Sequence, residues 1–351
     1  MIKLNEKQII DLFFSKLIKK NKSNLNLRDD VSVIFFQSLK DNHGKYFTTN
    51  NLVIKSDMLV ESTDVVKQMA PWQMARKSVV SSVSDMSAKG ISSPFYSVLS
   101  LGIPRTWTKN KINNLILGFQ RASKEFDITF LGGDTNESKE LIIDCVLIGF
   151  LSPKVNCMPK RNGAINDDVV VVSGEFGYSA SGLNILLKNC KAKGEFKEKA
   201  IESVLNPSPR HKFGKVFGKY FSSSIDSSDG LSTSLYELAT QSKADFFIDS
   251  PPLPEGLKEF SETNSLDLHN LIFNGGEEYE IVATIKPSNF KKIVALSNKF
   301  KLKVIVIGKV KTGKGRVFVK SDKTIDLTNK KRKMFDKDYY LLKNQGYMHF
   351  C

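Results

Sequence analysis

Five short acidic motifs constrain this chain more than any other feature of its sequence. Each follows an apolar run or lies in a Ser/Gly turn, so that its carboxylate projects from a defined backbone position. They are Asp29-Asp30, Ser56-Asp57, Ser84-Asp85, Gly132-Gly133-Asp134-Thr135 and Asp226-Ser227-Ser228-Asp229-Gly230. The chain is otherwise basic, with a net charge of +15. Carboxylates gathered against that background indicate Mg²⁺, which is commonly shared between protein carboxylates and substrate phosphates. The motifs therefore favour phosphoryl transfer.

The composition is that of a globular enzyme. A chain of 351 residues with 41% hydrophobic and 25% charged residues favours two domains with substantial cores. No segment approaches the roughly 20 apolar residues of a membrane helix, and the N-terminus has no signal-peptide layout. The four cysteines lie far apart without a CxxC pair, which argues against zinc or disulfides and fits a cytoplasmic location.

The basic excess is mostly lysine and is densest at Lys330-Lys331-Arg332-Lys333. A nucleic-acid site is expected to show a basic stripe with interleaved aromatics or a known motif, and the sequence has neither. We therefore expect a lysine-rich solvated surface and no nucleic-acid partner, with a positive field that helps to gather anionic substrates.

Helical and strand patterns alternate along the chain, which predicts an α+β or α/β fold. A break near Ser152-Pro153 divides the chain into an N-terminal domain over 1–152 and a C-terminal domain over 153–351. We expect helices at 5–20, 71–89, 108–126, 179–187, 195–205, 211–221, 231–241 and 288–299, and strands at 31–36, 46–56, 95–103, 141–150, 168–173, 246–248, 279–285 and 304–307.

Some of the motifs have ordinary structural interpretations. Asp29-Asp30 precedes a strand, where such pairs usually form a turn, and Ser56-Asp57 could form an Asx turn at a strand end. Asp85 differs, because it lies between Val83 and Met86 inside a helical pattern. A carboxylate there requires a partner, either a metal or an arginine.

The glycine-rich motifs are also ambiguous when each is taken alone. Gly132-Gly133-Asp134 predicts a tight turn that could offer amides to phosphate and a carboxylate to a metal. Ser228 or Asp229 could cap the helix that starts near Leu231, or that helix N-terminus could bind an anion. Gly275-Gly276-Glu277-Glu278 is a second such turn. P-loop, protein-kinase and dinucleotide-binding signatures are missing from the sequence.

The order of these motifs resembles that of the thiamine-monophosphate kinase family, whose superfamily includes aminoimidazole ribonucleotide synthetase, selenophosphate synthetase and a hydrogenase-maturation protein. The resemblance covers roughly residues 25–310. It rests on Arg28-Asp29-Asp30, Lys55-Ser56-Asp57-Met58-Leu59-Val60, Ser84-Asp85-Met86-Ser87-Ala88-Lys89-Gly90, Leu131-Gly132-Gly133-Asp134-Thr135, Lys160-Arg161-Asn162-Gly163-Ala164, Ile225-Asp226-Ser227-Ser228-Asp229-Gly230-Leu231 and Gly275-Gly276-Glu277-Glu278-Tyr279-Glu280.

The resemblance implies a two-domain α+β fold like that of aminoimidazole ribonucleotide synthetase. It implies an N-terminal αβ domain that forms a barrel across a homodimer and a C-terminal αβ domain with a ferredoxin-like core. It also implies several Mg²⁺ ions, ATP as co-substrate and thiamine monophosphate as acceptor. The implied metal residues are Asp30, Lys55 (through its backbone carbonyl), Ser56, Asp57, Asp85, Asp134, Asp226 and Asp229.

The resemblance implies ATP contacts for Gly133, Asp134, Arg161 and Ser228. Asp64, Glu277 and Phe335 are implied to contact thiamine monophosphate. The acceptor phosphate is already ionised near neutral pH, so no general base is expected. Catalysis would come from in-line positioning and from charge neutralisation by Mg²⁺ and Arg161.

Two departures from the family pattern are visible. Asn26-Leu27-Arg28 replaces the usual Gly-x-Gly before Asp29, and Lys55 replaces a small hydroxyl residue. Three alternatives therefore stay open: another ATP-dependent enzyme of the superfamily, a non-catalytic nucleotide-binding relative, and a basic nucleic-acid-binding protein.

Overall fold

The computed structural model describes residues 8, 29–34, 39–40, 46–47, 51–151, 158–321 and 338–346. The expected helix at 5–20 (Gln8 excepted), the segment Asn26-Leu27-Arg28, the cluster Lys330-Lys331-Arg332-Lys333 and Phe335 lie outside these residues. No helix among them is long and apolar enough to cross a membrane.

The described elements alternate between strands and helices, as the sequence predicts. The strands are β1 Ser32–Ile34, β2 Leu39–Lys40, β3 Tyr46–Phe47, β4 Asn51–Val60, β5 Phe95–Pro104, β6 Ile128–Ser138, β7 Ile142–Leu151, β8 Val169–Val172, β9 Phe221–Asp226, β10 Ala244–Ile248, β11 Ile281–Ile285, β12 Ile305–Thr312, β13 Val317–Lys320 and β14 Tyr339–Leu341. The helices are α2 Glu61–Asp64, α3 Pro71–Ala88, α4 Lys109–Phe126, α5 Tyr178–Lys188, α6 Gly194–Leu205, α7 His211–Phe217, α8 Leu231–Ser242, α9 Leu257–Thr263, α10 Leu268–Phe273 and α11 Pro287–Phe300, with a 3₁₀ turn η1 at Gly218–Tyr220.

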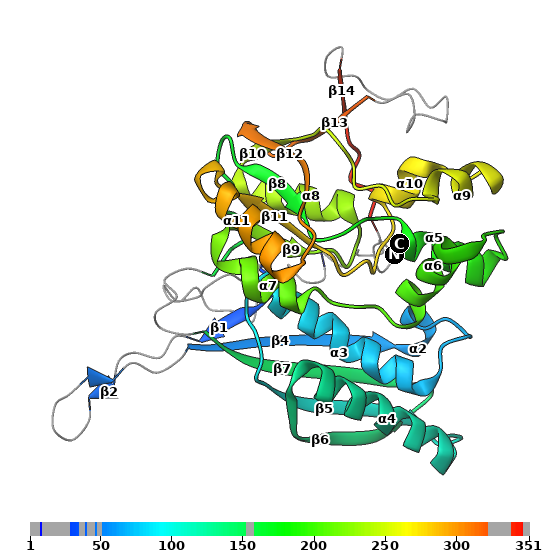
Figure 1. Cartoon of the computed structure of the whole chain (residues 1–351). Coiled ribbons are helices and arrows are strands. Elements are labelled where there is room, and N and C mark those ends of the chain that lie inside the picture. Colours follow the sequence, from blue (N-terminus) through cyan, green and yellow to red (C-terminus); the bar gives the residue numbers. More distant parts are fainter. Residues whose placement is uncertain are drawn as a thin grey trace.

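The N-terminal half is a five-stranded sheet in the order β1-β4-β7-β5-β6 (Figure 1). β4 is antiparallel to β7 over its whole length, and β5 is parallel to β6. Helices α3 and α4 pack on one face, where they bury a core that includes Val79, Val83 and Leu115. The opposite face leaves Met58 63% exposed and Phe150 41% exposed. One side of this sheet is therefore covered by its own helices, while the other carries apolar side chains at the surface.

Helix α3 begins and ends where the sequence predicts. Pro71 occupies its first turn, and the Ala70 amide donates to the Gln73 side chain over 2.8 Å. Gly90, at φ +70°, ends it in the left-handed conformation that favours glycine. Almost every residue after Gln73 is buried, because α3 lies between the N-terminal sheet and the C-terminal half (Figure 1). The helix therefore carries side chains into the centre of the molecule.

The C-terminal half is a seven-stranded sheet in the order β14-β13-β10-β12-β8-β11-β9. Its centre is the run of valines Val169–Val172, whose β8 is antiparallel to both β11 and β12. Two apolar clusters fill its two faces, one containing α5 and α8 and the other containing α7 and α11. The end of β9, at Asp226, points toward α3 and so brings the second sheet to the first.

The segment Gly132-Gly133-Asp134 is a strand and not the expected turn. It continues β6 to Ser138, in parallel register with β5. The register shifts between Ser97 and Val98, and Gly132 has φ +147°. The glycines thus accommodate a β-bulge within a long edge strand, and sequence alone did not separate a bulge from a reversal.

The two halves meet closely at α3 and α7. A Cβ placed on Gly214 would lie 2.0 Å from the carbonyl oxygen of Ser87, and one on Gly218 would lie 2.5 Å from the Cα of Gly90. Only glycine therefore permits this approach of the two backbones.

We predict that Gly214→Ala lowers the free energy of unfolding by about 1–3 kcal/mol, because the methyl group forces the halves apart. Urea denaturation checks this, with Lys215→Ala on the exposed side of the same helix as the control. Equal stability of the two variants would contradict the tight contact.

Candidate active site

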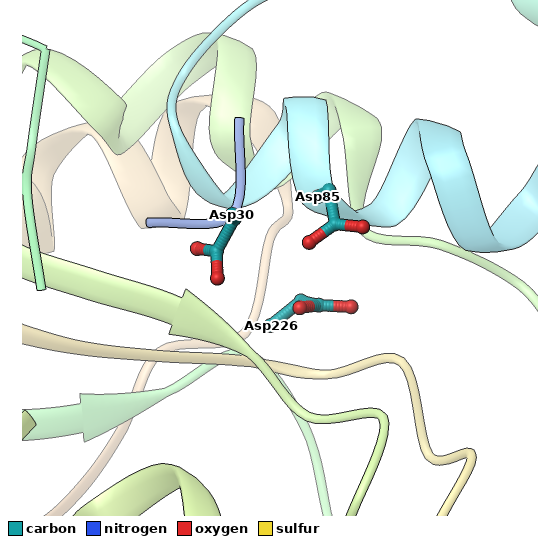
Figure 2. Close-up of side chains that lie close together, drawn as sticks. All are labelled: Asp30, Asp85 and Asp226. Carbon is teal, nitrogen blue, oxygen red and sulfur yellow. The ribbon is translucent and has the colours of Figure 1, made fainter. Parts of the chain in front are cut away.

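Three buried carboxylates converge from distant parts of the chain. Asp30 precedes β1, Asp85 lies in α3 and Asp226 ends β9 (Figure 2). One oxygen of each lies within 4.8 Å of one oxygen of the other two, and all three residues are less than a tenth exposed. Three motifs that the sequence separates by almost 200 positions thus form one cluster between the two sheets.

Two cations, Lys89 and Arg161, hold Asp29 and Asp30, the residues that lead into β1. The Lys89 ammonium, which is fully buried, lies 2.6 Å from Asp29 Oδ1 and 2.8 Å from Asp30 Oδ2. It also donates to the carbonyl oxygen of Ser224 over 2.6 Å. Arg161 donates from Nε to Asp30 Oδ1 over 2.8 Å and forms a second ion pair there through Nη2. Asp29 and Asp30 are therefore fixed by charge as well as by backbone.

Strand β4 supplies a lysine and a further carboxylate, Lys55 and Asp57, to the same site. The Lys55 ammonium lies 3.0 Å from Asp57 Oδ1 and 2.7 Å from Asp85 Oδ2. The Ser82 hydroxyl donates to Asp57 Oδ2 over 3.2 Å. Asp85 thus has the partner that its helical setting requires, but that partner is a lysine and not the arginine that was one alternative. An ammonium group only donates, so the Lys55 side chain itself cannot ligate a metal.

The Ser56 hydroxyl does not reach the cluster. Side chains alternate along a strand, so Ser56 faces the outer side of the sheet while Lys55 and Asp57 face α3. The hydroxyl donates to Asp144 Oδ1 on β7 over 2.6 Å. The implied role of Ser56 can therefore come from its backbone only, or from contacts on the outer face.

Asp134 and Gly133 lie far from the cluster in their own chain. Asp134 is in register with Ser100, Ser100 with Asp144, and Asp144 with Met58 of β4. Three strand spacings, about 14 Å, separate Asp134 from β4. Asp134 is exposed, on the outermost strand of the sheet as far as the structure describes it.

The turn after β9 is tied to the second glycine-rich motif. The Ser228 carbonyl accepts from the Glu277 amide over 2.6 Å, and the Ser227 carbonyl accepts from the Tyr279 amide over 3.0 Å. Ser228 and Asp229 are exposed beside the buried Asp226. The two motifs therefore form one structural unit at the cluster's rim.

The two acids implied to contact the acceptor are joined by a lysine. Lys77 of α3 lies 2.6 Å from Glu277 Oε1 and donates to the backbone carbonyl of Asp64 over 2.6 Å. The Asp64 carboxylate accepts from the Val60 amide over 2.7 Å. The Lys77 ammonium therefore links Glu277 to the backbone of Asp64, at a point eight residues before Asp85 along α3.

Lys77 and Lys89 are the functional-site residues that the sequence interpretation missed. Together with Asp85 they fall at intervals of eight and four residues, which places them on one face of α3. A row of charged residues along an otherwise apolar, buried helix was a visible signal that these groups pair inside the protein.

Crowding shifts the acidities of the cluster. Burial, and next the Asp226 carboxylate, raise the pKa of Asp85 well above its usual value. Burial and then repulsion by Asp30 raise the pKa of Asp226 to about 7. At Asp30 burial also acts to raise the pKa, but Arg161 and Lys89 outweigh it and hold the pKa low. The cluster therefore contains carboxylates that lack sufficient positive charge.

This donor set fits Mg²⁺. The cluster offers only carboxylate oxygens, which hard cations prefer, and their mutual repulsion would be relieved by a divalent charge. Asp30, Asp57, Asp85 and Asp226 are the residues that would hold such ions.

The comparisons with known proteins agree with this architecture. Residues 29–151 match the family model described as AIR synthase related protein, N-terminal domain. The chain is 41% identical to a thiamine-monophosphate kinase of Nitrosopumilus maritimus, over 95% of this chain and all of that one. It is 31% identical to that of Pyrococcus horikoshii, over 92% and 94% of the two chains. AaThiL, solved in complex with AMPPCP and TMP, superposes with a TM-score of 0.77 at 25% identity over 99% of each chain.

Fold and site thus define an α+β protein of the AIR synthase-related class. Within that class, the chain belongs to the thiamine-monophosphate kinase family.

We predict that the metal-free Asp226→Asn variant gains stability relative to the metal-free wild type as the pH rises from below 3.8 to above 7. The pKa of Asp226 is raised to about 7, so its neutral form favours folding at low pH, and that contribution disappears when the carboxyl ionises. Thermal unfolding in a chelator across this pH range checks it.

Asp245→Asn is the matched control. Burial acts to raise the pKa of Asp245, but hydrogen bonds from Arg316 and neighbouring amides hold it below its usual value. Removing this charge should therefore destabilise the protein at neutral pH. An Asp226→Asn variant that is also less stable than wild type above pH 7 would contradict the repulsion.

Proposed function

We propose that this protein transfers the γ-phosphoryl group of ATP to thiamine monophosphate, giving thiamine diphosphate. The observation that carries the proposal is the convergence of Asp30, Asp85 and Asp226 in a member of this family. Support comes from AaThiL, which was solved with both AMPPCP and TMP bound and whose fold this chain shares.

The residues of the cluster act by position and charge. Asp30, Asp57, Asp85 and Asp226 would hold Mg²⁺, which when bound neutralises the charge on the transferred and leaving phosphate oxygens. Arg161 is fixed against Asp30 at the edge of the cluster, where a guanidinium can also pair with phosphate. An ionised acceptor phosphate requires no proton acceptor, so these residues need only orient the two substrates in line.

The acceptor would lie at the Lys77 end of α3. Asp64 and Glu277 place carboxylates there, and the thiazolium ring of thiamine is a cation. Lys77 neutralises Glu277 until the substrate arrives and can then turn toward its phosphate. Phe335 remains the proposed aromatic contact.

ATP would contact Arg161, Ser228, Gly133 and Asp134. Arg161 and Ser228 lie near the cluster, but Gly133 and Asp134 cannot reach it within one chain. We therefore propose that the partner subunit of a homodimer supplies them.

Two free strand edges support this dimer. Among the described residues, β6 has no neighbour beyond β5, and β1 pairs with β4 only at Leu52–Ile54, so β4 from Lys55 onward is unpaired on that side. Unpaired edges are removed when sheets close into a barrel. Pairing β6 of one subunit alongside β4 of the other would bring Asp134 next to the strand that carries Asp57 and would cover the exposed Met58 and Phe150.

The expected division into domains at residue 152 is supported by the sheets, because every strand of the first ends by Leu151 and every strand of the second starts after it. In the second sheet, β12-β8-β11-β9 together with α11 and the helices after β8 follow the order of a ferredoxin-like core. We propose both assignments on that basis.

The direct test incubates the protein with ATP, Mg²⁺ and thiamine monophosphate, and follows ADP release while mass spectrometry identifies the product. We predict thiamine diphosphate from the wild type and a loss of turnover of about 100-fold or more in Asp57→Asn, because a metal-holding charge is removed. Asp167→Asn, an exposed aspartate paired with Lys311, should retain full turnover. Wild-type turnover in Asp57→Asn would refute the metal role.

Mixing subunits tests the shared site. Asp57→Asn and Asp134→Asn homodimers should each be inactive. Random reassociation should restore about a quarter of wild-type activity, because each mixed two-fold dimer contains one intact site. No recovery, in a mixture shown by native mass spectrometry to contain mixed dimers, would refute the partner's contribution.

A further inference from the structure

Lys55 occupies an unusual place for a lysine. It lies on the face of β4 that packs toward α3, and its side chain is 21% exposed. Its ammonium bridges Asp57 and Asp85, at 3.0 Å and 2.7 Å. The two carboxylates come from different elements, so the lysine links strand β4 to helix α3 at the centre of the acidic site.

We propose that Lys55 is a built-in cation that fills the position between Asp57 and Asp85, so that this protein binds one divalent ion fewer than it would with a small residue there. The proposal deepens the proposed phosphoryl transfer, because it specifies which charges at that site are covalently attached and which are exchangeable.

A free ion and the ammonium cannot share this position. A Mg²⁺ ion bridging Asp57 Oδ1 and Asp85 Oδ2 would need the oxygens that the ammonium contacts, at about 2.0–2.1 Å, and a +2 charge close to a +1 charge in a buried site is strongly unfavourable. The other oxygens of the two carboxylates, Asp57 Oδ2 and Asp85 Oδ1, remain able to hold an ion elsewhere in the cluster. The lysine is tethered by its own backbone, so it occupies the position without the loss of translational freedom that a free ion incurs.

The charge balance of the site leaves a place for an exchangeable divalent ion. With Glu237, which lies 3.6 Å from Arg161, six carboxylates (Asp29, Asp30, Asp57, Asp85, Asp226 and Glu237) face the three cations Lys55, Lys89 and Arg161, so that negative charge stays uncompensated when all six are ionised. The remaining negative charge lies on the side of Asp226, for which the structure shows no ion pair with a described residue. The Asp30–Asp85–Asp226 group can thus still accept an ion.

Lys89 differs from Lys55 in its surroundings. It has three acceptors (Asp29, Asp30 and the Ser224 carbonyl) and is fully buried, so it joins the two halves of the molecule. The Lys55 ammonium pairs with the two carboxylates Asp57 and Asp85 and keeps some exposure. Lys55 is therefore the cation whose removal would open a metal position without removing a contact between the halves.

The test counts metal ions. Mn²⁺ is titrated into the full-length protein with AMPPCP present, and free Mn²⁺ is measured by electron paramagnetic resonance. Lys55→Ser should bind about one more Mn²⁺ per chain than wild type, because two carboxylates regain an open position. Lys55→Arg, which keeps the charge, and Lys311→Ser, which removes an exposed paired lysine, should match wild type. Equal counts in Lys55→Ser and wild type would overturn the proposal.

A second test needs only the wild type and therefore works even if Lys55→Ser does not fold. Wild-type crystals are soaked with Mn²⁺ and AMPPCP, and the bound Mn²⁺ is located by anomalous scattering. We expect no anomalous peak between Asp57 and Asp85, where the Lys55 ammonium lies. A peak that contacts both carboxylates, with Lys55 turned away, would overturn the proposal. Because neither readout depends on turnover, failure of the kinase assay and failure of this inference are separate results.

Discussion

The repulsion between buried carboxylates is the constraint on which the rest of the structure depends. Asp30, Asp85 and Asp226 would separate if they were attached to flexible segments, since each would gain by reaching water. The chain prevents this by carrying them on a strand entry, a buried helix and a strand end that are packed against one another. Lys89 and Arg161 balance part of this negative charge. The rest must be balanced by further cations.

Helix α3 transmits that constraint through the molecule. Its row of Lys77, Asp85 and Lys89 extends over about 18 Å at 1.5 Å per residue. One end meets Glu277 and the proposed acceptor site, the middle meets the cluster of carboxylates, and the other end meets Asp29 and Ser224. A shift of this helix would therefore disturb every part of the site together, and the glycine contacts with α7 are what fix its position.

The sequence predicted local structure well where one element decides the outcome. Pro71 and Gly90 defined α3 to within one residue, and the valines of β8 were assigned correctly. It failed at Gly132-Gly133, because whether two glycines reverse the chain or bulge a strand depends on the neighbouring β5. It predicted that Asp85 needs a partner, but Lys55 became that partner through a pairing between β4 and α3 that local pattern does not contain.

The alternation of β4 explains why this site and the dimer are inseparable in the proposed mechanism. Asp57 faces α3 and the cluster of carboxylates, while its neighbour Ser56 faces the outer side of the sheet. From Lys55 onward, the edge of β4 away from β7 has no partner strand among the described residues. Any strand that pairs with this edge must lie within one strand spacing, about 4.8 Å, of the residues that would hold the metals. Closing the sheet and completing the site are then the same event, so assembly itself can control whether ATP meets its full set of contacts.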